Sequence, residues 1–289
     1  MIPAPFDYHR PGSLDEAIEL LARYGAEAKV LSGGMSLLPA MKLRLGAYAH
    51  LVDINRIPGL EYIKEEKGML RIGAGTRQAT LERSELIRSK YPILGDAIPM
   101  IADPLVRNRA TIGGNLANGD PANDGPAIAI ALGAELVAKG RGGERTIPAN
   151  RFYKSLYTTD LGNDEILIEI RIPVPPARSG GAYRKLKRKT GDFAAAAVAV
   201  QLQLDAKGAV ERAGIALTNL GATPIEAVEA MNFLQGNTPS ADVISKTSAL
   251  AAKAASPSAD RRGSVDYKRE MARVLAGRAM GAALERAKA

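Results

Sequence analysis

The sequence predicts a protein of mixed α-helices and β-strands, arranged in three consecutive stretches. Residues 1–57 alternate helical and strand patterns, residues 58–176 show short strands split by helical segments, and residues 177–289 begin with strands and end in an Ala-rich helical tail. The 289 residues are enough for about two domains. With 46% hydrophobic and 24% charged residues, the composition is that of a globular protein and excludes wholesale disorder.

The first stretch predicts a small α/β lobe. Ser13 and Glu16 form a capping box, and the apolar residues that follow recur on one helical face, so we expect a helix over residues 13–24. Three further elements have the expected spacing: a strand over residues 29–32, a helix over 36–45 and a strand over 51–54.

The second and third stretches predict more strands. Alternating apolar patterns indicate strands over residues 69–73, 135–138 and 166–172, with helical segments over 78–88 and 90–101. The Pro-rich run 173–176 is the best candidate for a linker, so we expect one domain over 1–176, with lobes at 1–57 and 58–176, and a second over 177–289. In the latter we expect paired strands at 194–204 and 210–217 and a last helix over 265–288.

Composition excludes several kinds of chemistry. The chain has no cysteine, which rules out disulfides, thiolate zinc sites and an iron–sulfur cluster held by this chain. Its two histidines, His9 and His50, lie far apart in the sequence and argue against a His-rich metal site. No stretch predicts a membrane span and the N-terminus does not resemble a secretory signal, so we expect a cytoplasmic protein.

The formal net charge of +8 could attract nucleic acid, an anionic membrane, an acidic partner or a phosphate-bearing cofactor. The densest basic run, residues 184–189, has few aromatic neighbours, and aromatic residues are only 4% of the chain, which disfavours single-strand nucleic-acid binding. The simplest interpretation of this run is a solvated strand or loop edge with its lysines outward.

Two glycine pairs are the strongest candidates for a binding site. The first lies in Ser32, Gly33, Gly34, Met35 and Ser36, where a predicted strand ends and a helix begins. Glycines let the backbone approach a ligand, and N–H groups at such a turn suit a pyrophosphate. A tight strand-to-helix turn without any ligand explains this motif equally well.

The second pair lies in a predicted loop whose polar residues could contact a phosphate, a flavin ring or a ribose. An Asx-rich capped loop is an equal alternative on spacing alone. Two such motifs in one chain favour a ligand. The motif comprises Thr111, Ile112, Gly113, Gly114 and Asn115, followed by Asp120 and Asp124.

The sequence contains no complete signature of the familiar nucleotide-binding folds. The run from Gly73 to Gln78 has the first two glycines of a Rossmann fingerprint but lacks the third, and no Walker sequence occurs. A standard NAD domain and a P-loop NTPase are therefore disfavoured.

With these motifs, the chain resembles the FAD-binding medium subunits of the molybdenum hydroxylases, the xanthine dehydrogenase and carbon monoxide dehydrogenase group. The resemblance covers essentially the whole chain. The opening residues and the run 185–192 look closest to the carbon monoxide dehydrogenase medium chain. The resemblance implies an α+β fold: a two-lobed FAD-binding domain of the molybdopterin dehydrogenase type, then a C-terminal domain of a small antiparallel sheet and helices.

The resemblance also implies roles for individual residues. Residues 32–36 would cradle the FAD diphosphate, residues 111–115 would contact the flavin side, and Asp124 would accept from the ribityl chain. Ile166 and Leu167 would touch the isoalloxazine ring, and Lys185 would face a flavin carbonyl, with a possible register shift of one residue. Phe193 is either a shield for the flavin or a core ring.

By the same resemblance, electrons would reach FAD from two [2Fe–2S] clusters of a small subunit, after oxidation at a molybdopterin site in a large subunit. The external acceptor would be a quinone or NAD, and the assembly a dimer of heterotrimers, with a possible association with the inner face of the membrane. Carbon monoxide is the first substrate expected, with aldehydes, N-heterocycles and purines as alternatives. The competing interpretations are a non-catalytic basic binding protein and a stand-alone FAD oxidase. The oxidase is disfavoured because such enzymes usually anchor the flavin through His or Cys, and neither His9 nor His50 lies in a glycine motif.

Overall fold

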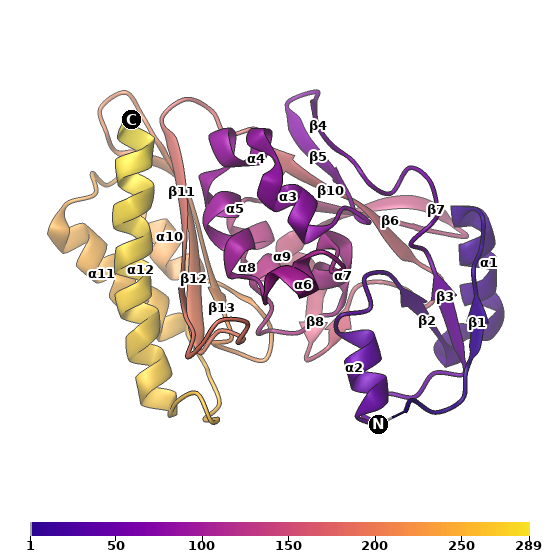
Figure 1. The fold of residues 1–289 in the computed structure, drawn as a ribbon. Helices are drawn as coiled ribbons and strands as arrows, with labels where there is room; N and C mark the ends of the chain where they lie inside the picture. Colours follow the sequence, from indigo (N-terminus) through magenta and orange to yellow (C-terminus); the bar gives the residue numbers. More distant parts are fainter. Residues whose placement is uncertain (1) are drawn as a thin grey trace.

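A computed structural model describes residues 2–289, and three main β-sheets succeed one another along the molecule (Figure 1). The N-terminal lobe is a parallel sheet in the order β1-β3-β2 with two helices. Its elements are β1 (Asp7–His9), α1 (Leu14–Tyr24), the 3₁₀ turn η1 (Gly25–Glu27), β2 (Ala28–Leu31), α2 (Leu37–Lys42) and β3 (His50–Asp53).

The predicted α/β lobe is confirmed, with differences at its edges. Ser13 caps α1 by accepting from the Glu16 N–H, as the capping box predicts. Helix α2 ends three residues before the predicted end because Arg44 adopts a left-handed backbone with φ of 60°. Strand β1 was not predicted, and its pairing with β3 brings His9 Nε2 to 3.1 Å from His50 Nδ1 although the two residues are far apart in sequence.

The middle lobe is an antiparallel five-stranded sheet in the order β4-β5-β10-β6-β7, with helices packed on it. The strands are β4 (Ile63–Glu66), β5 (Met69–Gly73), β6 (Glu135–Gly140), β7 (Gly143–Pro148) and β10 (Ile166–Pro173), and a small two-stranded sheet pairs β8 (Tyr153–Ser155) with β9 (Thr158–Thr159). The helices are α3 (Gln78–Arg83), α4 (Glu85–Lys90), α5 (Pro92–Ala97), the 3₁₀ turn η2 (Ile98–Met100), α6 (Pro104–Arg107), α7 (Ile112–Ala117), α8 (Asp124–Ala131) and α9 (Ala149–Phe152).

The two long helical segments predicted over 78–88 and 90–101 are shorter pieces in the structure. Ser84 has an extended backbone and caps α4 instead of continuing α3. Pro92 opens α5, where its missing N–H costs nothing, and a 3₁₀ turn containing Pro99 follows. Helix capping at Ser84 and the prolines Pro92 and Pro99 therefore divide the two segments that the apolar periodicity predicts as continuous helices.

The C-terminal region is an antiparallel sheet in the order β11-β12-β13-β14 followed by three helices. In Figure 1 the helices cover one face of this sheet, and α5 and α8 of the middle lobe contact the other. The elements are β11 (Ser179–Leu186), β12 (Ala196–Leu204), β13 (Val210–Thr218), β14 (Ile225–Glu226), α10 (Val228–Leu234), α11 (Ala241–Ala254) and α12 (Val265–Lys288).

Strand β12 shows why this sheet is buried on both faces. Ala197 and Ala199 pack into the core of the middle lobe, while Val198 and Val200, which alternate with them, pack against the C-terminal helices. Close approach also needs a glycine: a Cβ on Gly214 would overlap the Ala131 carbonyl oxygen of α8. The sheet therefore separates two hydrophobic cores and contributes side chains to both.

Asp96 in α5 ties the C-terminal helix to the middle lobe. Its carboxylate accepts from both terminal nitrogens of Arg286 on α12, each at 2.8 Å, from Arg184 at 2.9 Å and from the Tyr183 N–H at 3.2 Å. Burial raises the pKa of Asp96, but the hydrogen bonds from Arg286 and Tyr183 and the charges of both arginines outweigh it and hold the pKa below its ordinary value.

We predict that Asp96→Asn lowers the free energy of unfolding by about 2 kcal/mol at neutral pH, since it removes the anion that three donor groups share. A carboxylate with a lowered pKa stabilises the fold above its unfolded pKa of about 3.9 and loses this effect as the pH falls through the folded pKa. The difference between variant and wild type should therefore shrink below about pH 4.

Urea unfolding across pH measures this difference. Glu229→Gln is the control, because Glu229 forms an exposed ion pair with Lys253 that contributes at most about 1 kcal/mol. Equal free energies of unfolding for Asp96→Asn and wild type at neutral pH would show that the contacts of Asp96 with Arg286, Arg184 and Tyr183, here called the Asp96 clamp, do not stabilise the fold.

Candidate functional site

The first glycine motif forms the turn between β2 and α2. Gly34 has φ of 76°, a left-handed backbone that favours glycine. Gly33 packs so closely on the segment before the second motif that an added Cβ would overlap the Arg109 carbonyl oxygen. Glycine is therefore required at both positions, once for conformation and once for space.

The turn leaves backbone donors unpaired. Within residues 2–289, the N–H groups of Gly33, Gly34, Met35 and Ser36 donate to no backbone carbonyl. Gly33 and Gly34 are buried, and a buried N–H without a partner is costly and rare in folded proteins. Consecutive free donors of this kind are what an anion needs, and the diphosphate of FAD fits this donor set.

The second glycine motif lies at the start of a helix, so the prediction of a loop there was wrong. Thr111 caps α7 by accepting from the Gly114 N–H at 3.0 Å, so residues 112–117 are helical. The Ile112 N–H donates to the Thr76 carbonyl at 3.0 Å and the Gly113 N–H to the Ala74 carbonyl at 2.9 Å. Because these donors are already used, the glycines serve mainly close packing: a Cβ on Gly113 would overlap Ala74.

The two motifs meet in space, as a shared binding site requires. Ser32 Oγ lies 2.9 Å from Thr111 Oγ1, and Gly33 contacts the backbone at Arg109 that leads into Thr111. A turn rich in free N–H groups and a hydroxyl-bearing helix start thus form one continuous polar site between the N-terminal and middle lobes.

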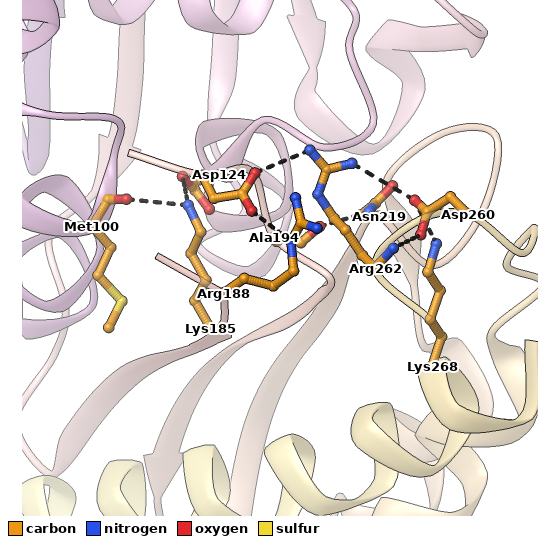
Figure 2. A network of polar contacts seen from close by, with 10 residues as sticks. Met100, Asp124, Lys185, Arg188, Ala194, Asn219, Asp260, Arg262 and Lys268 are labelled. Atoms are coloured by element: carbon orange, nitrogen blue, oxygen red, sulfur yellow. Dashed lines mark hydrogen bonds and ion pairs between the residues drawn. The ribbon is translucent and has the colours of Figure 1, made fainter. Parts of the chain in front are cut away.

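Asp124 and Lys185 are also brought together, by the start of α8 and by β11. Lys185 Nζ donates to Asp124 Oδ2 at 2.8 Å and to the Met100 carbonyl at 3.1 Å (Figure 2). The two side chains are only 1% and 6% exposed, and the Tyr183 hydroxyl donates to the second Asp124 oxygen at 2.5 Å. Burial raises the pKa of Asp124 above its ordinary range, while Lys185 and Tyr183 limit the rise.

The basic run is therefore not simply a solvated edge. Arg184 pairs with Asp96 and Lys185 is buried on Asp124, because β11 lies between the middle lobe and the C-terminal helices. Only the end of the run, Arg188 and Lys189, is exposed as expected.

Ile166 and Leu167 begin β10 and are buried, at 2% and 5% exposure. The pairing of β10 with β6 shifts register between Leu167 and Glu169, and the Ile168 carbonyl accepts from the Ala74 N–H at 2.9 Å. Ala74 also holds Gly113 of the second motif, so the start of β10 lies directly behind that motif.

A second polar network holds the loop that follows β11. Asp192 accepts from Arg188 and from Arg262, each at 3.1 Å. Arg262 and Lys268 both pair with Asp260 (Figure 2). Phe193 in this loop is 45% exposed with the Arg262 guanidinium 5.9 Å from its ring centre. Phe193 is thus not a core ring, and its role toward a flavin stays a prediction.

Sequence reasoning missed three residues of this region: Asn55, Arg77 and Tyr183. Asn55 and Arg77 contact the two glycine motifs, and Tyr183 completes the Asp124 cluster. For Arg77 the sequence held a signal, because this residue lies in the glycine-containing run 73–78 that partly matches a Rossmann fingerprint. In the structure Arg77 forms a β-bridge with Thr111. For Asn55 and Tyr183 the sequence offers no signal, since their partners lie far along the chain.

The chain is similar to known flavoprotein subunits throughout its length. Residues 4–175 match the family described as FAD binding domain in molybdopterin dehydrogenase, and residues 181–283 match the CO dehydrogenase flavoprotein C-terminal domain. The chain is 45% identical over 288 residues to the carbon monoxide dehydrogenase medium chain of Afipia carboxidovorans, covering 100% of both chains. It is 37% identical over 288 residues to subunit alpha of the 6-hydroxypseudooxynicotine dehydrogenase complex of Paenarthrobacter nicotinovorans, covering 100% of this chain and 97% of that one.

Its fold agrees with a solved relative. It superposes with a TM-score of 0.96 and 45% identity on a chain of carbon monoxide dehydrogenase from Hydrogenophaga pseudoflava, in a form that lacks the Mo-pyranopterin moiety of the molybdenum cofactor, covering 99% of each chain. The α+β fold and the FAD cofactor expected from the sequence are confirmed by these matches. The chain therefore belongs to the family of FAD-binding medium subunits of the molybdenum hydroxylases.

Proposed function

We propose that this chain carries electrons from the [2Fe–2S] clusters of a small partner subunit through FAD to an external acceptor, in a molybdenum enzyme that oxidises carbon monoxide. The observation that carries the proposal is the row of unpaired backbone donors at Gly33 and Gly34, buried beside Thr111, in a chain of this family. A non-catalytic basic binding protein is disfavoured because both parts of the chain match flavoprotein domains of this family.

The residues of the site divide the cofactor between them. Residues 32–36 would hold the diphosphate through backbone N–H groups, and residues 111–115 would lie alongside with the Thr111 hydroxyl. The Asn115 side chain would contribute through its amide N–H groups, because its Oδ1 already accepts from the Gly125 N–H at 3.1 Å. Asp124 and Lys185 would meet the ribityl and flavin end, where Ile166 and Leu167 would contribute apolar contacts. When bound, FAD supplies the capacity to accept and release electrons, which no side chain of this chain provides.

Charge is the contribution of the protein to this chemistry. A buried ammonium group beside a flavin carbonyl stabilises negative charge on the reduced ring, and Lys185 is held for this by Asp124 and the Met100 carbonyl. Asp124 also neutralises Lys185 in the absence of a reduced flavin, so a buried charge does not stand alone.

Carbon monoxide is the favoured substrate of the whole enzyme because of the similarity to the Afipia carboxidovorans medium chain. The similarity to a 6-hydroxypseudooxynicotine dehydrogenase subunit keeps an N-heterocycle as the second candidate, and an aldehyde or purine hydroxylase would use this chain in the same role. We further propose a large molybdopterin subunit, a dimer of heterotrimers, a quinone or NAD as acceptor and a cytoplasmic location. Within residues 2–289, no helix combines the length and apolar character that crossing a bilayer requires.

A negative charge on the turn tests the diphosphate site. Ser36 is exposed at the start of α2, where Asp is as good a helix cap as Ser, so Ser36→Asp should fold normally. We predict that it weakens FAD binding by the deflavinated protein about tenfold or more, because its carboxylate repels the diphosphate. Titration of FAD by fluorescence measures the effect, and Ser36→Asn is the uncharged control of matched size. Equal FAD affinity of the two variants would place the diphosphate elsewhere.

A second prediction concerns the flavin end. Lys185→Met should lower the two-electron midpoint potential of the bound flavin, by on the order of 30 mV, since the cation is lost and Asp124 remains. A redox titration of the flavin-loaded protein gives the potential. Lys189→Met removes the same charge from an exposed position of the same run and should leave the potential unchanged. An unaltered potential in Lys185→Met refutes the role.

A further inference from the structure

Arg77 links the two glycine motifs through hydrogen bonds on their backbone carbonyl side. Its guanidinium donates to the Arg109 carbonyl at 2.5 Å and to Asn55 Oδ1 at 2.6 Å. Asn55 Nδ2 in turn donates to the Ser32 carbonyl at 2.7 Å, and Asp53 fixes Asn55 by accepting from the same amide and from the Asn55 N–H. The Arg77 side chain thus reaches the first turn through Asn55 and directly contacts Arg109, which precedes the second motif.

These bonds decide which way the backbone donors point. In a trans peptide the C=O and N–H groups point in opposite directions, so anchoring the Ser32 carbonyl on Asn55 turns the Gly33 N–H to the other side. The Arg109 carbonyl packs against Gly33, where its partial negative charge would oppose an anion. Arg77 donates a hydrogen bond to that carbonyl, and its positive charge offsets the partial negative charge of the oxygen.

Arg77 is also a half-buried cation without a carboxylate partner. No salt bridge joins it to an acidic residue within residues 2–289, although Glu61 lines the same cavity of about 190 Å³, together with Ser32 and Asn55. Burial and the neighbouring Arg109 lower the pKa of Arg77, and the charges of Glu61 and Asp53 offset only part of this effect. A guanidinium nevertheless stays charged in proteins. A half-buried cation whose hydrogen bonds go only to neutral oxygens keeps more of its charge for a nearby anion than a cation in an ion pair does.

We infer that Arg77 is a positioning residue of the FAD diphosphate site: through Asn55 and the Arg109 carbonyl it fixes the direction of the turn's N–H groups, and its unpaired charge adds attraction for the diphosphate. This inference rests on the proposed function, because it takes the diphosphate to bind at residues 32–36. It assigns to the chain a long-range cation in addition to the backbone donors.

The test is FAD titration of deflavinated Arg77→Gln, Arg77→Lys and Arg83→Gln at about 0.01 M and about 1 M salt, where charges are weakly and strongly screened. Arg83 is the matched control, an exposed arginine that also donates to a backbone carbonyl, that of Ala79, on the same helix. We expect Arg77→Gln to weaken FAD binding at least tenfold at low salt, with a smaller loss at high salt. Arg77→Lys should lose about threefold or more and keep the salt dependence of wild type, because an ammonium keeps the charge but cannot span both acceptors.

FAD affinity of Arg77→Gln within twofold of Arg83→Gln overturns the inference. So does a tenfold loss that is the same at both salt concentrations, which marks a purely structural residue. If Arg77→Gln does not fold, Arg77→Lys decides, and wild-type FAD affinity in this variant overturns the inference. A loss in Ser36→Asp without one in Arg77→Gln refutes only the role of Arg77, whereas no loss in either variant refutes the diphosphate site itself.

Discussion

The close approach of Gly33 to the backbone at Arg109 is the contact on which the site depends. It brings the end of β2 against the residues that lead into Thr111, and it lets Ser32 and Thr111 share a hydrogen bond. A Cβ at position 33 would overlap the Arg109 carbonyl oxygen, so any side chain there would force the two backbone segments apart. The free N–H groups of the turn would then no longer face the helix start that completes the site.

Although both motifs carry a glycine pair, they contribute in different ways. The first turn keeps its backbone donors unpaired, which makes it an anion site, while the second motif uses its donors internally and packs its glycines against Ala74. The C-terminal sheet adds the third part, since β11 buries Lys185 on Asp124 of α8. A site built from three sheets needs each interface to be held firmly, and the Asp96 clamp on Arg286 is one such restraint.

Local patterns in the sequence predicted much of the fold. The capping box of α1, the strands over 69–73 and 166–172 and the final helix all follow from periodicity and caps, and the glycine motifs identified the family. The helical state of residues 112–117 was missed because two glycines lower helix propensity, which Thr111 capping and packing on Ala74 overcome. The inward turn of Lys185 and the bonds of Arg77 and Asn55 were also missed, since their partners are far away in sequence and only the assembled lobes bring them together.

Residue-resolved hydrogen exchange of the deflavinated and flavin-loaded chain measures the backbone donors directly. We expect the amides of Gly33, Gly34 and Met35 to exchange fast without the cofactor and to become strongly protected when FAD binds, because only the ligand supplies their acceptors. The Gly113 amide, already bonded to Ala74, should be protected in both states. Turn amides that exchange at the same rate with and without FAD would contradict the account.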